Sequence, residues 1–515
     1  MEFVTDMAAK RAEMTPEAVA FSDFDTGRNF TFAEIDRRAC QLGGVFRARG
    51  LEDGDRVAVL CLNHPDFFVL LFAAQKTGIV LVPLNWRQPA AELNLVLSAS
   101  RAKLLFHDEA FAETAGELAA GSGIGLLPLG AMANGESALD GVLEEGGSTP
   151  VRGGLVKAGT PWYLLYTSGT TGLPKAVIQT AGMAYANTVC YAQSAGIVTG
   201  ETGVNYLPLF HTAGINLPTL PLFLFGGTST VLRKFEADTV LDLVDAGRVS
   251  CFFAVPAVYQ AMALSGKIET TDFSRVRSLY CGGAPVPKHL LQDFQKRGVT
   301  ICNGMGMTET GPTIFLMDKA HAAEKIGSVG KPQLLTDVRL VDGRGQVVQG
   351  AGEGEVEVRG PNVTPGYMDN PEATAAAFTT DGWLKSGDIA RRDEDGYYSI
   401  VDRIKDMYIS GGENVYPAEV ERVLLTHPAV LEAVVVGVPD EKWGEAGAAY
   451  LIARPGEMLD AAGLTGWCRS RLAAYKVPKS FLVVEELPRT AAGKVRKTIL
   501  KDTFLQENDR RFLKS

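Results

Sequence analysis

Short apolar segments alternate with helix-like segments along the first hundred residues, and this alternation limits the possible folds more than any other feature. Arg56–Leu62 and Gly78–Pro83 are apolar and short, as buried strands are, whereas Phe67–Lys76 and Ala90–Ser98 have helical spacing. This rhythm indicates an α/β fold with largely buried sheets. The segment from Ala112 to Gly154 has weak periodicity and much Gly, Ala and Ser, so we expect a connecting region there rather than core.

The chain has 515 residues, too many for one hydrophobic core, so we expect a large domain followed by at least one smaller one. Its character changes after the strand-like segment Tyr397–Val401, where a charged run is followed by a shorter unit. Within that unit, Ala433–Val438 has the composition of a buried strand. We place the boundary at Lys405, which divides the chain into residues 1–404 and 405–515.

Acidic residues outnumber basic ones, 60 to 50, so the formal net charge is −10. This balance argues against general binding of nucleic acid, which depends on basic contacts to phosphates. The longest apolar run near the N-terminus, Phe67–Ala74, is much shorter than the roughly 20 residues of a transmembrane segment. The sequence has no signal-peptide pattern, and its seven cysteines are scattered without a C-x-x-C pair. We therefore expect a cytoplasmic protein with reduced thiols.

A loop rich in phosphate-binding groups follows the apolar segment Trp162–Tyr166. Glycines let the backbone approach an anion, backbone N–H groups and hydroxyls donate to phosphate oxygens, and a lysine adds positive charge. The loop is not a Walker A motif, because two residues separate its glycines where that motif has four before its Gly-Lys pair. Its candidate ligands are Thr167, Ser168, Gly169, Thr170, Thr171, Gly172 and Lys175.

Together with motifs further along the chain, this loop resembles the adenylate-forming superfamily of acyl-CoA synthetases, luciferases and nonribosomal-peptide adenylation domains. The resemblance extends from about Thr31–Ile35 to Lys494. It implies a large N-terminal domain of sheets flanked by helices plus a small β-barrel, and a small mobile α+β C-terminal domain. It also implies an enzyme that activates a carboxylate with ATP and Mg²⁺, releases pyrophosphate and then transfers the acyl group to a thiol.

The resemblance assigns further nucleotide-binding residues. Gly282, Gly283 and Ala284 correspond to the adenine-binding edge, and the motif of Asn303, Gly304, Met305, Gly306, Met307, Thr308 and Glu309 to the family's aromatic-Gly-Met-Thr-Glu segment. In this motif Thr308 would bind the α-phosphate and Glu309 would bind Mg²⁺, a hard cation that prefers oxygen ligands. Met305 replaces the usual aromatic residue. Asp388 and Arg403 match the ribose-binding pair.

The C-terminal unit carries the remaining implied residues. Lys405 occupies the family's hinge position, and Lys494 its catalytic position, where a cation would neutralise charge between the substrate carboxylate and the α-phosphate. The acceptor thiol implied by this unit is CoA. The residues that match CoA-binding segments are Gly411, Gly412, Trp443, Tyr475 and Lys479. A carrier-protein thiol and a luciferase-like oxidation remain alternatives.

The acid itself is less constrained by the sequence. His211 matches the residue at the carboxylate end of the family's acyl pocket, and the expected lining is Ile215, Val255, Gly283, Met305, Gly306 and Met307. There is no Asp at Phe210–His211 for an amino-acid substrate, and Gly304 stands where malonate-type ligases carry an arginine. An apolar pocket is therefore expected, which leaves medium- or long-chain fatty acids and aryl or phenylpropenoic acids open. A homodimer is possible.

Overall fold

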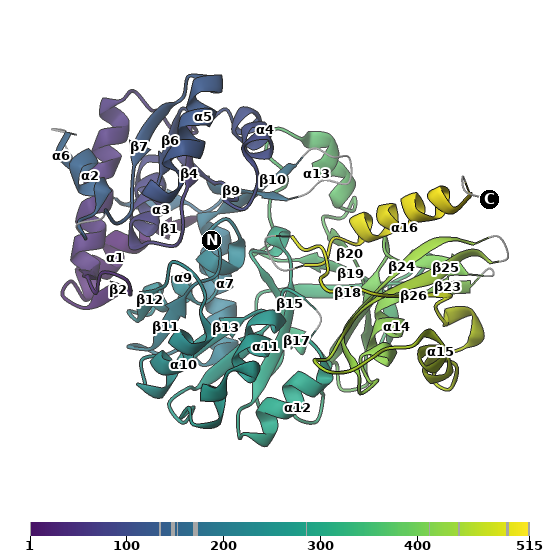
Figure 1. The fold of residues 1–515 in the computed structure, drawn as a ribbon. Coiled ribbons are helices and arrows are strands. Elements are labelled where there is room, and N and C mark those ends of the chain that lie inside the picture. The colour runs from purple at the N-terminus through teal and green to yellow at the C-terminus, as the bar shows by residue number, and fades with distance from the viewer. Residues whose placement is uncertain are drawn as a thin grey trace.

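Two large sheets form the N-terminal part of the protein in this computed structural model (Figure 1), which describes residues 2–132, 135–145, 150–151, 153–167, 174–284, 286–410, 413–440, 443–490 and 494–512. The first sheet has six strands in the order β10-β9-β5-β4-β6-β7. Its strands are parallel except for the antiparallel pair β9 and β10. The bounds are β4 Arg56–Leu60, β5 Val80–Pro83, β6 Leu104–His107, β7 Gly125–Pro128, β9 Pro161–Thr167 and β10 Lys175–Thr180.

The second sheet has nine strands in the order β17-β16-β15-β14-β13-β11-β12-β2-β3. Its central strands are parallel, and antiparallel strands complete both edges. The bounds are β2 Val19–Asp23, β3 Asn29–Thr31, β11 Thr202–Asn205, β12 Thr228–Val231, β13 Cys251–Ala254, β14 Ser278–Cys281, β15 Ile301–Gly306, β16 Thr313–Leu316 and β17 Lys331–Pro332. A short pair, β1 Phe3–Thr5 and β8 Leu155–Lys157, lies apart from both sheets.

Helices cover both sheets. They are α1 Met7–Met14, α2 Phe32–Ala48, α3 Pro65–Thr77, α4 Ala90–Ser100, α5 Ala112–Ser122, α6 Ala138–Glu145, α7 Ala181–Ala195, α8 Thr212–Asn216, α9 Thr219–Leu224, α10 Ala237–Asp245, α11 Pro256–Leu264, α12 Lys288–Lys296 and α13 Pro371–Ala377. Helix α3 is apolar on every side because it lies in the core that joins the two sheets. There the Phe68 ring stacks on Phe21 of β2 at 4.6 Å between centroids.

The predicted α/β class and the early strands and helices are confirmed, but the expectation for residues 112–154 is wrong. That segment contains α5, α6 and β7, which is the edge strand of the six-stranded sheet. Leu118, Leu127 and Leu139 are at most 4% exposed. The many small residues weaken the periodicity, yet these few leucines supply enough apolar contact to fix both helices and the strand.

A four-stranded antiparallel sheet, β18-β19-β20-β21, forms in the region where we expect the small β-barrel. Its strands are β18 Asp337–Val341, β19 Gly352–Arg359, β20 Leu384–Arg392 and β21 Tyr398–Arg403. A core that includes Phe315 and Tyr398 joins this sheet to β16 of the nine-stranded sheet, with the two rings 4.6 Å apart.

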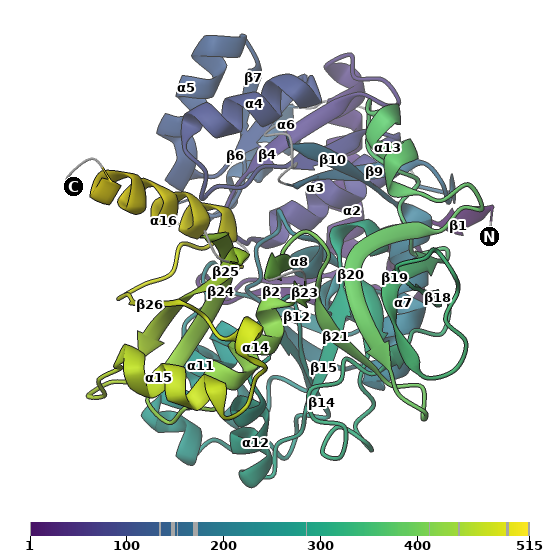
Figure 2. The same ribbon diagram turned by 90° about the vertical axis from the view of Figure 1, so that its right-hand side faces the viewer.

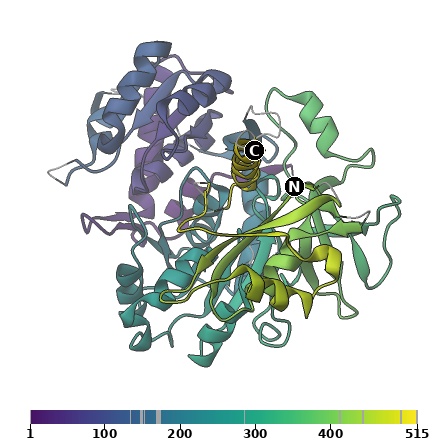
Figure 3. The same cartoon turned by 45° about the vertical axis from the view of Figure 1, so that its right-hand side comes forward.

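The C-terminal part has its own sheet, β23-β22-β25-β24, with β26 beside β25. The bounds are β22 Tyr408–Ser410, β23 Glu413–Val415, β24 Val430–Asp440, β25 Gly444–Ala453 and β26 Ser480–Val483, with helices α14 Pro417–Leu424, α15 Ala461–Arg469 and α16 Lys497–Phe512. Figures 2 and 3 show this yellow-green unit in front of the N-terminal sheets, with α14 next to β21. The chain therefore passes from the four-stranded sheet to the C-terminal sheet between Arg403 and Tyr408, and Lys405 lies in this connection.

A hydrogen bond links the four-stranded sheet to the C-terminal part near this connection. Asp402 of β21 accepts a hydrogen bond from the backbone N–H of Ala418, in the first turn of α14, at 2.8 Å. Its second oxygen accepts from the N–H of Arg403 at 2.7 Å. Burial raises the pKa of Asp402 to about 6. Along the described ranges, no helix combines the length and apolarity that crossing a membrane requires.

Candidate active site

The ends of the predicted phosphate loop lie side by side at the edge of the six-stranded sheet. Thr167 ends β9 and Lys175 begins β10, and the two residues are paired in register. The Thr167 hydroxyl donates to the Lys175 carbonyl at 3.5 Å. Residues Ser168, Gly169, Thr170, Thr171 and Gly172 lie outside the described residues. The two residues that flank the predicted loop, Thr167 and Lys175, thus lie next to each other on antiparallel strands.

The Thr308–Glu309 pair follows β15 and is held by groups from β10 and from the segment before α13. Gln179 Nε2 donates to the Thr308 carbonyl at 2.9 Å, and the backbone N–H of Thr364 donates to the Glu309 carbonyl at 2.8 Å. The Tyr367 hydroxyl donates to Glu309 Oε1 at 3.0 Å. Glu309 is 9% exposed, so its carboxylate is fixed in a nearly buried position beside the loop strand.

Close backbone approach explains the glycines that follow β14 and lie within β15. A Cβ on Gly282 would lie 2.9 Å from the Gly304 carbonyl oxygen, and one on Gly306 would collide with the Pro312 carbonyl. Gly283 has φ +82°, in the left-handed region that favours glycine. Ala284 comes directly after it. These glycines let two neighbouring strand ends meet without side chains between them.

The predicted ribose pair is assembled across the four-stranded sheet. Asp388 on β20 and Arg403 on β21 are partners in register, and Arg403 Nε donates to Asp388 Oδ1 at 2.8 Å. Asp388 is 4% exposed, and its second oxygen, Oδ2, is buried without a hydrogen-bond partner in the described part of the chain. A buried carboxylate oxygen without a partner is costly, so this atom is suited to accept a hydrogen bond from a bound ligand.

Lys494 enters the site from the C-terminal part. Although the residue as a whole is exposed, burial of its ammonium is the main cause that lowers the pKa of Lys494. The positive charges of Arg403 and Lys405 lower this pKa further, whereas the carboxylates of Asp388 and Glu309 act in the opposite direction. The structure therefore brings Lys494 within electrostatic range of both the ribose pair and the proposed metal ligand.

His211 precedes the first residue of α8 and lies within electrostatic range of Lys494. Burial lowers the pKa of His211 to about 3, and the charges of Lys494 and Arg87 contribute to the shift. Its ring lies 4.6 Å from that of Phe210, and its Nε2 atom is buried with no partner in the described ranges. A neutral imidazole with one free ring nitrogen is available for hydrogen bonding to a ligand.

The remaining acyl-pocket candidates lie in three different clusters. Ile215 is fully buried in the core between the two large sheets, and Val255 packs on the core around β13 and β14. Met305 and Met307 pack against the core of the four-stranded sheet. Asn303, predicted to bind nucleotide, donates its amide to the Ser328 carbonyl at 3.1 Å, and its role in nucleotide binding stays a prediction. A single acyl pocket lined by these residues stays a prediction.

The CoA candidates lie within the C-terminal part. Lys479 forms an ion pair with Asp440 at 2.6 Å, and Asp440 also accepts from the backbone N–H of Trp443 at 2.9 Å. Tyr475 packs on the core of this part. Gly411 and Gly412 lie outside the described residues, but the preceding Ser410 pairs with Gly444, next to Trp443. The structure thus groups Trp443 and Lys479 around one carboxylate.

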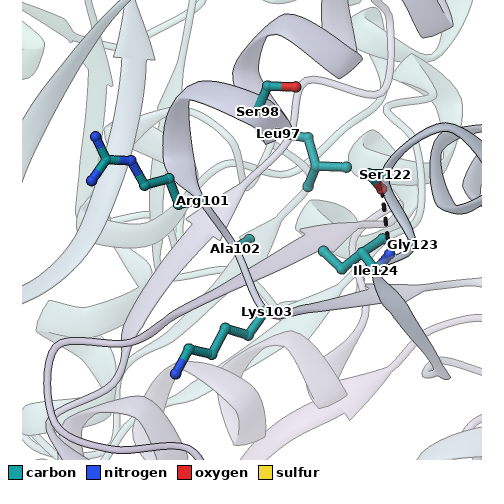
Figure 4. Close-up of a pocket in the computed structure, with 8 residues that line it drawn as sticks. All are labelled: Leu97, Ser98, Arg101, Ala102, Lys103, Ser122, Gly123 and Ile124. Carbon is teal, nitrogen blue, oxygen red and sulfur yellow. Dashed lines mark hydrogen bonds between the residues drawn. The ribbon is translucent and has the colours of Figure 1, made fainter.

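Tyr367, Gln179 and Arg87 are site neighbours that the sequence reasoning missed. Gln179 and Tyr367 bond to site residues that are far along the chain, and Arg87 is far along the chain from His211, whose pKa its charge lowers. None of the three lies in a motif with a local chemical pattern. A pocket of about 340 Å³ lies between the C-terminal ends of α4 and α5. Figure 4 shows the residues that line it. Its Lys103 is already paired with Asp55 at 2.6 Å. None of the predicted site residues lines it.

Comparison with known proteins identifies the family. The family model described as AMP-binding enzyme matches residues 8–368, and that of the AMP-binding enzyme C-terminal domain matches residues 419–494. The chain belongs to the AMP-binding enzyme family.

Two relatives described as feruloyl-CoA synthase, from Amycolatopsis sp and Streptomyces sp, are 43% identical over 96% of this chain and 98% of their own. A long-chain-fatty-acid–CoA ligase of Mycobacterium tuberculosis is 34% identical over 97% of this chain and 98% of its own. Among solved structures, o-succinylbenzoate CoA synthetase from Bacillus subtilis, in complex with its acyl-adenylate intermediate, has a TM-score of 0.87. It is 32% identical and covers 97% of this chain and 99% of that chain.

Proposed function

We propose that this protein is an AMP-forming acid–CoA ligase that activates an apolar carboxylic acid with ATP and transfers the acyl group to CoA. The observation that carries the proposal is the position of Lys494. This cation comes from the C-terminal part and lies within electrostatic range of Asp388 and Glu309 of the N-terminal part. A cation shared between a ribose site and a metal site fits an enzyme that joins an acid to the α-phosphate of ATP.

The nucleotide fits the arrangement of the described groups. Asp388 Oδ2, which has no partner among the described residues, would accept a hydrogen bond from a ribose hydroxyl, while Arg403 holds the other oxygen. Lys175 and the hydroxyl and glycine residues that precede it in the sequence would contact the phosphates, and Thr308 would contact the α-phosphate. In this arrangement the glycines at 282 and 283 leave room for the flat base.

Magnesium fits the carboxylate of Glu309. Within the described ranges, no group of three or more His, Cys, Asp or Glu side chains is placed to hold a metal ion. Mg²⁺ commonly binds one or two carboxylates together with substrate phosphates, and Glu309 beside the phosphate loop matches this pattern. The bound ion would neutralise negative charge on the triphosphate.

The first step joins the acid to AMP. A carboxylate oxygen attacks the α-phosphorus, a new O–P bond forms, and the bond to the bridging oxygen breaks, so that pyrophosphate leaves. Lys494 neutralises the charge that accumulates between carboxylate and phosphate. His211, kept neutral by burial, can approach the carboxylate without adding charge, and its free Nε2 offers one hydrogen bond.

The second step needs Lys494 to leave and a thiol to enter. We place the boundary between residues 1–404 and 405–515, with Lys405 as the hinge, because the sheet changes between β21 and β22. Rotation of the C-terminal part would bring Trp443 and Lys479 to the acyl-adenylate with bound CoA. The CoA thiol attacks the acyl carbon, the thioester bond forms, and AMP leaves.

We infer that the acid is a phenylpropenoic or related aryl acid. This inference rests on similarity: the feruloyl-CoA synthases share 43% identity with this chain, against 34% for the fatty-acid ligase, at nearly equal coverage. The aromatic neighbours of His211 agree with it. Phe210 lies against His211, and the Trp86 ring meets Phe210 edge-on at 6.1 Å.

Exchange of labelled pyrophosphate into ATP tests the first step without CoA. Ferulate, indoleacetate, a medium-chain fatty acid, a long-chain fatty acid and 2-succinylbenzoate should be compared at equal concentrations. Ferulate is expected to support the fastest exchange, and CoA addition should then give a thioester and AMP. Exchange without CoA consumption would point to another acceptor, and absence of exchange with every acid would overturn the proposal.

A further inference from the structure

Tyr367 lies between two charged groups of the nucleotide site. Its hydroxyl donates to Glu309 Oε1 at 3.0 Å, and the Lys175 ammonium lies 5.2 Å from the centre of its ring. Lys175 begins β10 and Glu309 lies in the short helical turn after β15, and although their charges are opposite, no ion pair joins them in the described part of the structure. Tyr367 contacts both, through different parts of its side chain.

The backbone holds Tyr367 rigidly against the phosphate-loop strand. Residues 366–368 run along the outer edge of β10: the Ile178 N–H donates to the Gly366 carbonyl at 3.1 Å, and the Met368 N–H to the Ala176 carbonyl at 2.9 Å. The Tyr367 N–H donates to Thr374 Oγ1 at 3.0 Å. The ring therefore has a fixed place relative to Lys175, which begins the same strand.

We propose that Tyr367 is a positioning residue that keeps Lys175 and Glu309 apart and directs each to its own ligand. The ring face attracts the ammonium, and the hydroxyl orients the carboxylate. Without the ring, the two charges would pair with each other and lose affinity for phosphate and Mg²⁺. The inference rests on the proposed function, because it assumes that Mg²⁺ and a nucleoside triphosphate bind at this site.

Two substitutions separate the two contacts. Tyr367→Phe removes the hydrogen bond to Glu309 but keeps the ring under Lys175. The factor by which Mg²⁺ increases the affinity for the nucleotide should therefore fall about tenfold. Tyr367→Leu removes both contacts and should additionally weaken nucleotide binding measured without Mg²⁺. Tyr185→Phe is the matched control, because it loses a tyrosine hydroxyl bonded to the Thr5 carbonyl at 3.0 Å, in another part of the chain.

The measurement is calorimetric titration of the full-length protein with α,β-methylene-ATP, with and without Mg²⁺. The ratio of the affinity with Mg²⁺ to the affinity without Mg²⁺ is expected to fall about tenfold in Tyr367→Phe and to stay unchanged in Tyr185→Phe. Formation of thioester from supplied acyl-adenylate and CoA should be the same in wild-type protein and in all three variants, since that step needs no Mg²⁺. Thermal melting checks that each variant is folded.

The outcomes distinguish this inference from the proposed function. If wild-type protein binds the analogue with Mg²⁺ and Tyr367→Phe keeps the wild-type ratio, the positioning role is wrong while the proposed function stands. If the ratio falls equally in Tyr185→Phe, the effect is a general loss of stability and the positioning role of Tyr367 is also wrong. If wild-type protein does not bind the analogue at all, the proposed function itself fails.

Discussion

Arg403 and Asp388 face each other on neighbouring strands, and the arginine binds one carboxylate oxygen while the other stays buried. The Nε–Oδ1 distance is 2.8 Å, and Oδ2 has no partner within the described ranges. The two carboxylate oxygens of Asp388 thus have different environments: Arg403 binds Oδ1, whereas Oδ2 is able to accept a hydrogen bond from a ligand. This asymmetry allows the ribose assignment to be tested by one substitution.

Asp388→Asn should raise the KM for ATP by at least about tenfold, because an amide cannot accept at both positions and a charge-assisted hydrogen bond is lost. Calorimetric titration with AMP should show the same loss. The control is Asp393→Asn, which removes a carboxylate paired with Lys325 at 2.9 Å. Unchanged AMP affinity in Asp388→Asn would contradict the ribose role.

Lys494→Ala should reduce pyrophosphate exchange by about 100- to 1,000-fold, because the removed cation stabilises charge that develops during the first step. Thioester formation from supplied acyl-adenylate should largely persist. Lys501→Ala provides a control, since this nearby lysine lies on α16, 3.6 Å from Glu445. Equal loss of both half-reactions in Lys494→Ala would reject the division of labour between the two steps.

Trp443→Ala should raise the KM for CoA without changing pyrophosphate exchange, because an aromatic face that stacks on the CoA adenine is used in the second step. Steady-state kinetics with CoA as the varied substrate measure this effect. Trp467→Ala is a suitable comparison, as that indole in the same unit donates to the Val423 carbonyl at 3.2 Å. A normal KM for CoA in the Trp443 variant would refute the assignment.

His211 should make stability depend on pH. Its folded pKa of about 3 lies below the roughly 6.5 of an unfolded histidine, so the unfolded state binds more protons between these values. Stability from this residue is therefore fully present above pH 6.5 and is lost as the pH falls toward 3. In His211→Gln the fall in Tm between pH 6.5 and 4 should be shallower. Parallel curves for the two proteins would show that His211 does not stay neutral.

Sequence patterns predicted the parts of the fold whose stability comes from local apolar runs. The strand over Arg56–Leu62 is β4, and the continuous apolar run Phe67–Ala74 lies in a helix buried between sheets. The sequence pattern did not predict the helices and the strand within residues 112–154. Small residues weaken the hydrophobic periodicity there, and only a few leucines are buried. The ribose pair is assigned through resemblance to the family's motifs, and the structure places Asp388 and Arg403 opposite each other on adjacent strands.

The contact between Tyr367 and Glu309 could not be predicted in this way. The two residues are 58 positions apart, and they meet because the chain returns to the edge of β10 after passing through the nine-stranded and four-stranded sheets. Nothing in the local sequence of Tyr367 indicates that path. The same holds for Gln179, whose partner Thr308 is 129 positions away.

Asp402 forms a hydrogen bond that the proposed rotation between the two steps would have to break. It lies three residues before Lys405, and the N–H that it holds belongs to Ala418, thirteen residues after Lys405. A rotation about Lys405 that withdraws Lys494 must separate these two atoms. In the proposed cycle, the acid-activating arrangement would thus be stabilised in part by a carboxylate outside the reaction centre, so a substitution at Asp402 would change the rate of rotation without removing a group proposed to contact the substrates.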